Sequence, residues 1–117
     1  MSDPDASTLT EQVLNHENAR YWGTAGCSGG NRGLGFRPAF LDTDTGRVYL
    51  SAFADGRPAS VHVLHGLPQT LVVARTPGGQ VCAVHAKVVS GFARDGCFYT
   101  REEAMRIAED EAFPVAA

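Results

Sequence analysis

Lysine is nearly missing from this chain of 117 residues, which has one lysine, Lys87, and nine arginines. Such a bias indicates a GC-rich bacterial source. Long apolar runs are missing too, because no stretch approaches the roughly 18 apolar residues that a membrane helix needs. The start of the chain, MSDPDASTLTEQ, lacks the basic residues and apolar core of a secretory signal. We therefore expect a cytoplasmic protein without a membrane partner.

Cysteine is scarce as well, with three residues in the whole chain. An odd number in no recognisable spacing argues against a disulfide framework and is typical of reduced cytosolic thiols. Cys82 lies in an apolar run, so we expect it in the core. Cys27 is the better candidate for a reactive thiol, which needs an accessible, electropositive setting. No sequence rule places a histidine beside it.

No charge of one sign dominates, since the net charge is −3. It is −4 over residues 1–19, +4 over residues 20–100 and −3 over residues 101–117. The basic middle can favour an anionic partner, or it can simply complement the acidic ends. Nucleic-acid-binding domains usually have a larger basic excess. Nucleic-acid binding is therefore a secondary hypothesis.

The clearest local structure is a hairpin within Gly35–Phe53, GFRPAFLDTDTGRVYLSAF. Two apolar-rich arms, Phe36–Leu41 and Val48–Phe53, flank the polar connection Asp-Thr-Asp-Thr-Gly. The aspartates of this connection suit local turn bonding. We interpret this stretch as scaffold.

Two further hairpins are predicted downstream. The arms Leu71–Arg75 and Val81–Val89 flank Thr-Pro-Gly-Gly, which has turn chemistry. The pair Asp95-Gly96 lies between apolar arms and suits a two-residue type I′ turn. Val61–Leu64 is a candidate for another short strand.

A helix is expected near each end of the chain. Residues 1–7 are polar and are expected to be disordered, and a helix is expected from Thr8 to Arg20. Thr8 and Glu11 have the spacing of a capping box, but the apolar stripe of this helix is thin. A helix with so thin a stripe packs weakly or needs a partner.

The last helix begins with a second capping box, between Thr100 and Glu103. Pro114 ends this helix or follows its end. One face is apolar and docks on a sheet; it consists of Ala104, Met105, Ile107, Ala108 and Ala112. The chain is thus predicted to be a single α+β domain over residues 1–117. Its antiparallel sheet has about four to six strands built from hairpins, with an N-terminal and a C-terminal helix packed on it.

Three short patterns suggest chemistry that their surroundings do not support. Asp44-Thr45-Gly46 matches the tripeptide of retroviral-type aspartic proteases, but the adjacent Arg47 would keep the carboxylate ionised. Asp42-x-Asp44 opens like a calcium loop, but the later ligand positions do not fit. The glycine-rich residues 23–35 lack the lysine of a phosphate loop.

The glycine-rich segment still has two arginines at its borders. Backbone amides together with Arg32 and Arg37 can meet an anion. Trp22 stands beside the same segment, and tryptophan is enriched at pockets and interfaces. We therefore predict the ligand- or partner-binding site around Trp22, Arg32 and Arg37, at the entrance of the first hairpin.

One arrangement suggests a metal. His62-x-x-His65 and Cys82-x-x-His85 supply four nitrogen and sulfur ligands in two close pairs. In a strand, however, residues three apart point to opposite faces, which separates the members of each pair. We predict no metal and no cofactor, and keep these four residues as the candidates for zinc.

Two segments, GFRPAFLDTDTGRVYLSAFADGRP and RDGCFYTREEA, resemble stretches of small uncharacterised bacterial proteins, some of them carried on mobile or accessory gene elements. The resemblance covers about two-thirds of the chain. No activity is attached to these proteins, so the resemblance implies no catalytic or binding residue.

The leading hypothesis is a small soluble bacterial accessory protein that works by binding a protein or small ligand, as a homo-oligomer. None of the short patterns above supports an enzyme. Exposed strand edges, and a first helix whose apolar stripe is thin, favour association with a partner. The alternatives are a small hydrolase, a thiol- or metal-dependent enzyme, or a weak nucleic-acid-binding module.

Overall fold

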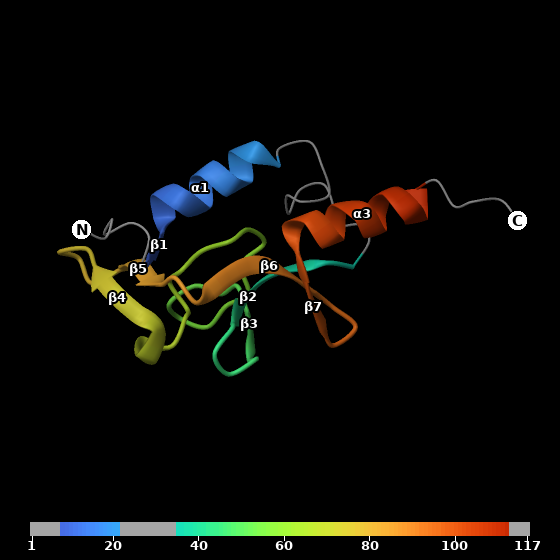
Figure 1. Ribbon diagram of the computed structural model, residues 1–117. Coiled ribbons are helices and arrows are strands. Elements are labelled where there is room, and N and C mark those ends of the chain that lie inside the picture. The colour runs from blue at the N-terminus through green and yellow to red at the C-terminus, as the bar shows by residue number, and fades with distance from the viewer. Residues whose placement is uncertain (1–7, 22–34, 113–117) are drawn as a thin grey trace, which may run out of the picture.

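Two antiparallel sheets and two helices form the fold in a computed structural model that describes residues 8–21 and 35–112 (Figure 1). The strands are β1 (Thr8–Thr10), β2 (Arg37–Asp42), β3 (Val48–Leu50), β4 (Val72–Arg75), β5 (Val81–His85), β6 (Val88–Arg94) and β7 (Cys97–Thr100). One sheet has the order β1-β5-β4 and the other the order β3-β2-β6-β7. Helices α1 (Glu11–Arg20) and α3 (Arg101–Ala112) lie on the same side of the sheets. The predicted α+β class, with a helix toward each end, is confirmed, although the strands divide between two sheets.

The first predicted hairpin is present as β2 and β3, with Phe40 opposite Tyr49. In its turn the Asp42 carboxylate accepts the Asp44 amide N–H at 3.0 Å, and Gly46 has a φ of 75°. The turn role predicted for this connection is therefore confirmed. Burial raises the pKa of Asp42, but bonds from Asp44 and neighbouring turn groups outweigh it and leave the pKa below its usual value. Asp44 itself lies 3.2 Å from the Lys87 ammonium.

The other two hairpins also form. β4 and β5 are joined through residues 76–80, and β6 and β7 through Asp95 and Gly96. Positive φ angles of 53° at Asp95 and 80° at Gly96 are those of the predicted type I′ turn. The single arm predicted over Val81–Val89 is wrong, because β5 ends at His85 and β6 begins at Val88. Here the chain leaves one sheet and enters the other.

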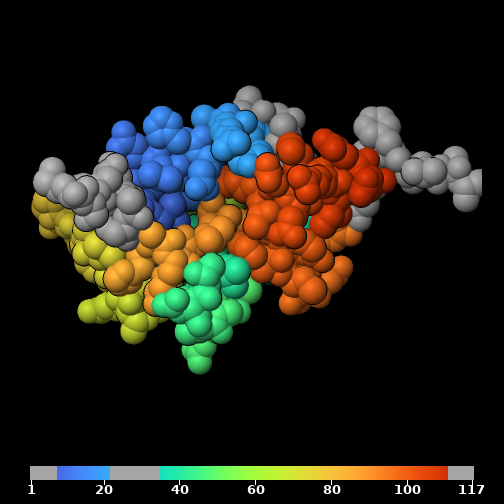
Figure 2. Space-filling view, in the orientation of Figure 1, coloured from blue at the N-terminus to red at the C-terminus, as the bar shows by residue number. Residues whose placement is uncertain are grey.

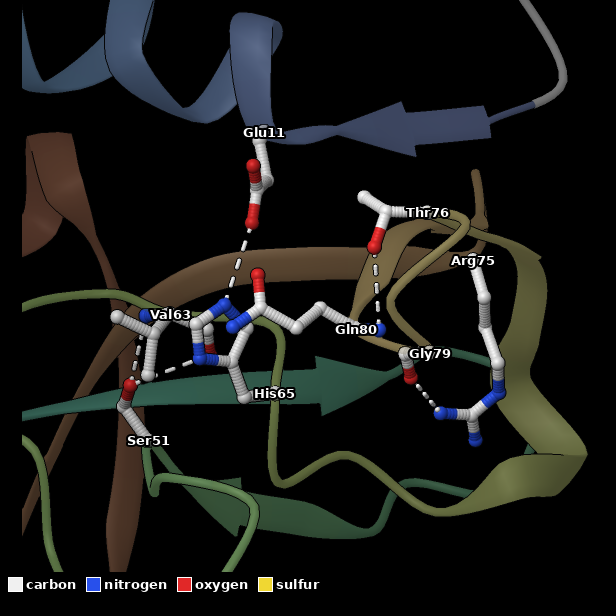
Figure 3. A network of polar contacts seen from close by, with 8 residues as sticks. All are labelled: Glu11, Ser51, Val63, His65, Arg75, Thr76, Gly79 and Gln80. Carbon is white, nitrogen blue, oxygen red and sulfur yellow. Dashed lines mark hydrogen bonds and ion pairs between the residues drawn. The ribbon is translucent and has the colours of Figure 1, made fainter.

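Val61–Leu64 is not a strand, contrary to the prediction. The Ser51 hydroxyl accepts the Val63 N–H at 2.9 Å (Figure 3) and donates to the Val61 carbonyl at 2.8 Å. Because a side chain satisfies these backbone groups, the segment needs no neighbouring strand. It lies across the four-stranded sheet on the side of the helices, where His62 contacts the Phe40 and Phe92 rings.

Both helices are capped by threonine. Helix α1 starts at Glu11, later than predicted, because Thr8–Thr10 pairs with β5 as β1. Thr10 is its N-cap and accepts the Val13 N–H at 3.1 Å. The capping box predicted for α3 is confirmed: Thr100 and Glu103 exchange bonds of 2.9 and 3.1 Å. Neither of these described helices is long and apolar enough to cross a membrane.

The buried apolar residues form two clusters. The larger one joins both sheets and α1 and consists of Leu9, Leu14, Phe40, Leu64, Leu67, Leu71, Val81, Val84 and Val88. The smaller lies under α3 and consists of Phe36, Phe92 and Ala104. In α1, Leu14 is the one buried residue. The apolar contacts of α1 by themselves are therefore weak, as the thin apolar stripe in its sequence predicted.

Candidate functional site

Three polar side chains are buried where α1, β6 and α3 meet. Arg101, the first residue of α3, is 4% exposed, and Ser90 in β6 and His62 are each 5% exposed. Buried polar groups need partners, because water no longer supplies them. These three side chains, together with Glu17 and Asn18 of α1, form a connected group that we call the polar cluster.

The Arg101 guanidinium is the hub of the polar cluster. Its Nε lies 3.3 Å from a Glu17 carboxylate oxygen and 3.3 Å from the Ser90 hydroxyl, which itself donates to Glu17. Its Nη2 donates to Asn18 Oδ1 at 2.8 Å and to His62 Nδ1 at 3.1 Å. One side chain thus ties α1, the four-stranded sheet and the residues 61–64 together.

His62 is held in its neutral form. Its Nε2 lies 2.6 Å from the Gly91 carbonyl oxygen, which only accepts, so this nitrogen carries the proton and Nδ1 accepts from Arg101. Burial lowers the pKa of His62 to about 3, and the Arg101 charge acts in the same direction. Backbone hydrogen bonds to Gly91 and Ala39 oppose this effect without reversing it. Both ring nitrogens are engaged.

The polar cluster does not form a catalytic triad. A serine nucleophile needs a histidine that takes its proton, but Ser90 donates to Glu17 while His62 faces Arg101 and Gly91. The geometry supports recognition of polar groups more than proton transfer.

A pocket of about 380 Å³ opens above the polar cluster, between the end of α1 and the start of α3. Figure 2 shows the surfaces of these two helices side by side. The pocket is lined by Glu17, Arg20, Tyr21, Ser90, Thr100, Arg101 and Glu102. Every one of these side chains carries a hydroxyl, a carboxylate or a guanidinium, so the pocket is suited to a polar molecule.

The four-stranded sheet has a second candidate surface on its other side. Phe40, Ser90 and Phe92 point toward the core and α3, so residues that alternate with them point away. The register places seven apolar side chains there, of which Ala39 is fully buried. We call the other six the open face: Leu41, Val48, Leu50, Val89, Ala93 and Phe98. Val48, Leu50 and Val89 are 41%, 44% and 36% exposed.

Gly91 makes room for Phe98 on the open face. A Cβ atom at this position would overlap Phe98 and the backbone oxygen of Tyr99. Phe98 therefore lies across the sheet above Gly91. Beside it is a hollow of about 350 Å³, with Arg37, Val48 and Leu50 among its lining residues.

The predicted binding residues are only partly placed. Trp22 and Arg32 lie outside the described residues, as does Cys27. Arg37 is exposed at the start of β2, on the same side of the sheet as the open face. The site predicted around Trp22, Arg32 and Arg37 thus stays a prediction, with Arg37 at the rim of the hollow.

The four candidate zinc ligands have separate surroundings. His62 belongs to the polar cluster, and His65 lies 3.3 Å from the Glu11 carboxylate (Figure 3). Cys82 is half-buried in β5, where His85 is exposed. Within residues 8–21 and 35–112, no three His, Cys, Asp or Glu side chains gather as metal ligands would.

Arg101 and Ser90 were missed by sequence reasoning, although each leaves a signal. Arg101 precedes Ala104 and Ala108 by three and seven residues, so it shares their buried helix face. Ser90 alternates with Val88 and Phe92, which places it on the core side of a strand. In both cases the signal is a polar residue at a position where the helix or strand pattern otherwise places apolar residues.

No family model matches this chain, and no curated protein or solved structure is significantly similar to it. The resemblance to small bacterial proteins of accessory gene elements therefore stays a prediction.

Proposed function

We propose that this is a cytoplasmic bacterial accessory protein of the mobile-element type that acts by binding, and that it self-associates through the open face. One observation carries the proposal. Six large apolar side chains of the described residues are well exposed, and three of them, Val48, Leu50 and Val89, share this face. Large contiguous apolar patches are rare on monomers and usually mark interfaces.

A second copy of the chain is the partner that fits best, because the rim of the open face carries both signs of charge. Arg37 and Asp95 border one end of the strands, and Asp44 and Lys87 border the other. With a two-fold axis along the strands, Arg37 meets the end that carries Asp95 in the other copy. With the axis across the strands, Arg37 meets the end that carries Asp44. Either arrangement is self-complementary, as isologous interfaces must be.

Sheet-on-sheet packing supplies the driving force. Two such faces pack about 10 Å apart and bury interdigitating side chains. Burial of exposed valine and leucine surface contributes about 25 cal/mol per Å². A rim of mixed charge does not favour nucleic-acid binding, because such binding depends on many Lys and Arg contacts with phosphate groups.

The experiment is light scattering after size exclusion, with a matched pair of variants. Val48→Arg places a charge on the open face, whereas Val73→Arg changes a valine of similar exposure, 45%, on strand β4 of the other sheet. We expect wild type and Val73→Arg to elute at twice the chain mass of 12.4 kDa, and Val48→Arg to elute as a monomer.

Two outcomes contradict the proposal. One is a wild-type protein that is monomeric at about 100 µM, where interfaces of standard size are usually saturated. The other is loss of the dimer in Val73→Arg to the same extent as in Val48→Arg. Circular dichroism of each variant separates loss of association from loss of fold.

A further inference from the structure

Stability by itself does not explain the polar floor of the pocket between α1 and α3. An ion pair such as that of Arg101 and Glu17 can often be replaced by apolar residues of the same volume with no loss, or with a gain. Residues that depart from the apolar pattern of a core are commonly functional. The chain nevertheless places Arg101, Ser90 and Glu17 beneath an opening of about 380 Å³. That volume is within the range of small-molecule sites.

The rim of the pocket carries one uncompensated charge of each sign. Glu17 balances the charge of Arg101 at the floor. Arg20, at the end of α1, and Glu102, in the first turn of α3, also line the pocket. Across the part of the chain that the structure describes, neither Arg20 nor Glu102 has an ion-pair partner. Arg20 lies over the Tyr21 ring, at 5.6 Å from its centroid.

We propose that this pocket binds a small zwitterion, with a free amino acid as the simplest representative. Its carboxylate pairs with the Arg20 guanidinium, whose planar fork suits carboxylates. Its ammonium group pairs with the Glu102 carboxylate on the opposite wall. Ser90 and Thr100 place hydroxyl oxygens beside the pocket for the remaining polar atoms. A simple anion would pair only with Arg20 and a simple cation only with Glu102, so in either case the other charge would stay unpaired.

The test is a titration of the ¹⁵N-labelled full chain followed by amide chemical shifts. The probes are glycine and L-serine as zwitterions, acetate as the anion alone, methylammonium as the cation alone, and glucose as an uncharged polar molecule. We expect saturable shifts at Tyr21, Ser90 and Glu102 with glycine and serine. Acetate, methylammonium and glucose are expected to bind about two- to fivefold more weakly, as loss of one exposed ion pair implies.

Two variants at exposed positions test the assignment without disturbing the core. Arg20→Gln and Glu102→Gln are each expected to weaken glycine binding about two- to fivefold. Arg106→Gln, at an exposed position of α3 outside the pocket lining, serves as the matched control and is expected to bind normally. Three results would overturn the proposal: no saturable shift with either zwitterion, equal binding of acetate or glucose, or glycine binding unchanged in both variants.

Discussion

We expect acid to destabilise this protein through His62, because the fold buries this side chain in its neutral form. An unfolded histidine has a pKa near 6.5, whereas the folded pKa of His62 is about 3. Since the folded-state pKa is the lower one, the unfolded state takes up the proton first as the pH falls. The contribution of His62 to stability is therefore complete above pH 6.5 and is lost progressively toward pH 3.

The size of this effect follows from the two pKa values. Between pH 7 and pH 4.5 the linkage relation gives a loss of about 2.5 kcal/mol in the free energy of unfolding. Asp42 does not interfere in this window. Its folded-state pKa is lowered below the unfolded value of 3.8, so its contribution is lost only at more acidic pH.

Urea unfolding at about pH 7 and pH 4.5 measures the effect, with His62→Gln as the comparison. Glutamine has an amide that can donate to the Gly91 carbonyl or accept from Arg101, but it does not titrate. The wild type should lose about 2.5 kcal/mol more than His62→Gln between the two pH values. Equal losses in the two proteins would refute the assignment of His62 as a buried neutral histidine. The comparison uses only the change in each protein between the two pH values, so a lower stability of His62→Gln at pH 7 does not affect it.

Two substitutions test local features of the fold. Gly91→Ala should destabilise by at least about 1–3 kcal/mol, because the new Cβ overlaps the Tyr99 backbone. Gly78→Ala is the control, because its Cβ would meet only the Thr76 hydroxyl, at the ordinary contact distance of 3.8 Å. An equal loss in urea midpoint would contradict the prediction. Thr100→Ala should lower the unfolding free energy by about 1 kcal/mol, since it removes the oxygen that accepts the Glu103 N–H. Thr100→Ser keeps that oxygen and should restore most of the stability, and no difference between the two variants would argue against the cap.

The features predicted correctly depend on residues close together in the sequence. Asp95-Gly96 makes a type I′ turn because these two residue types tolerate positive φ, whatever surrounds them. The Thr100–Glu103 capping box likewise needs only its own first turn of helix. Such interactions act over a few bonds, so a local pattern is sufficient to predict them.

The wrong boundaries share a different physical cause. Val81–Val89 has an unbroken strand propensity, and only the position of the second sheet shows that the chain turns after His85. Val61–Leu64 has the composition of a strand, yet its backbone groups form hydrogen bonds with the Ser51 hydroxyl instead of with a neighbouring strand. In both places a residue or strand far away in sequence decides the local structure, as tertiary context often does.

Sequence alone determined the α+β class, the three hairpins, a helix near each end and the cap of α3, because periodicity and turn chemistry are local properties. The predicted capping box between Thr8 and Glu11 was wrong, since Thr8 pairs in β1 and Thr10 caps α1. Only the tertiary structure decided which polar side chains meet. Glu17, His62 and Arg101 are separated by dozens of residues, so no local pattern shows that they meet. They become one buried cluster because α3 lies over β6 and α1 lies beside it, an arrangement set by packing.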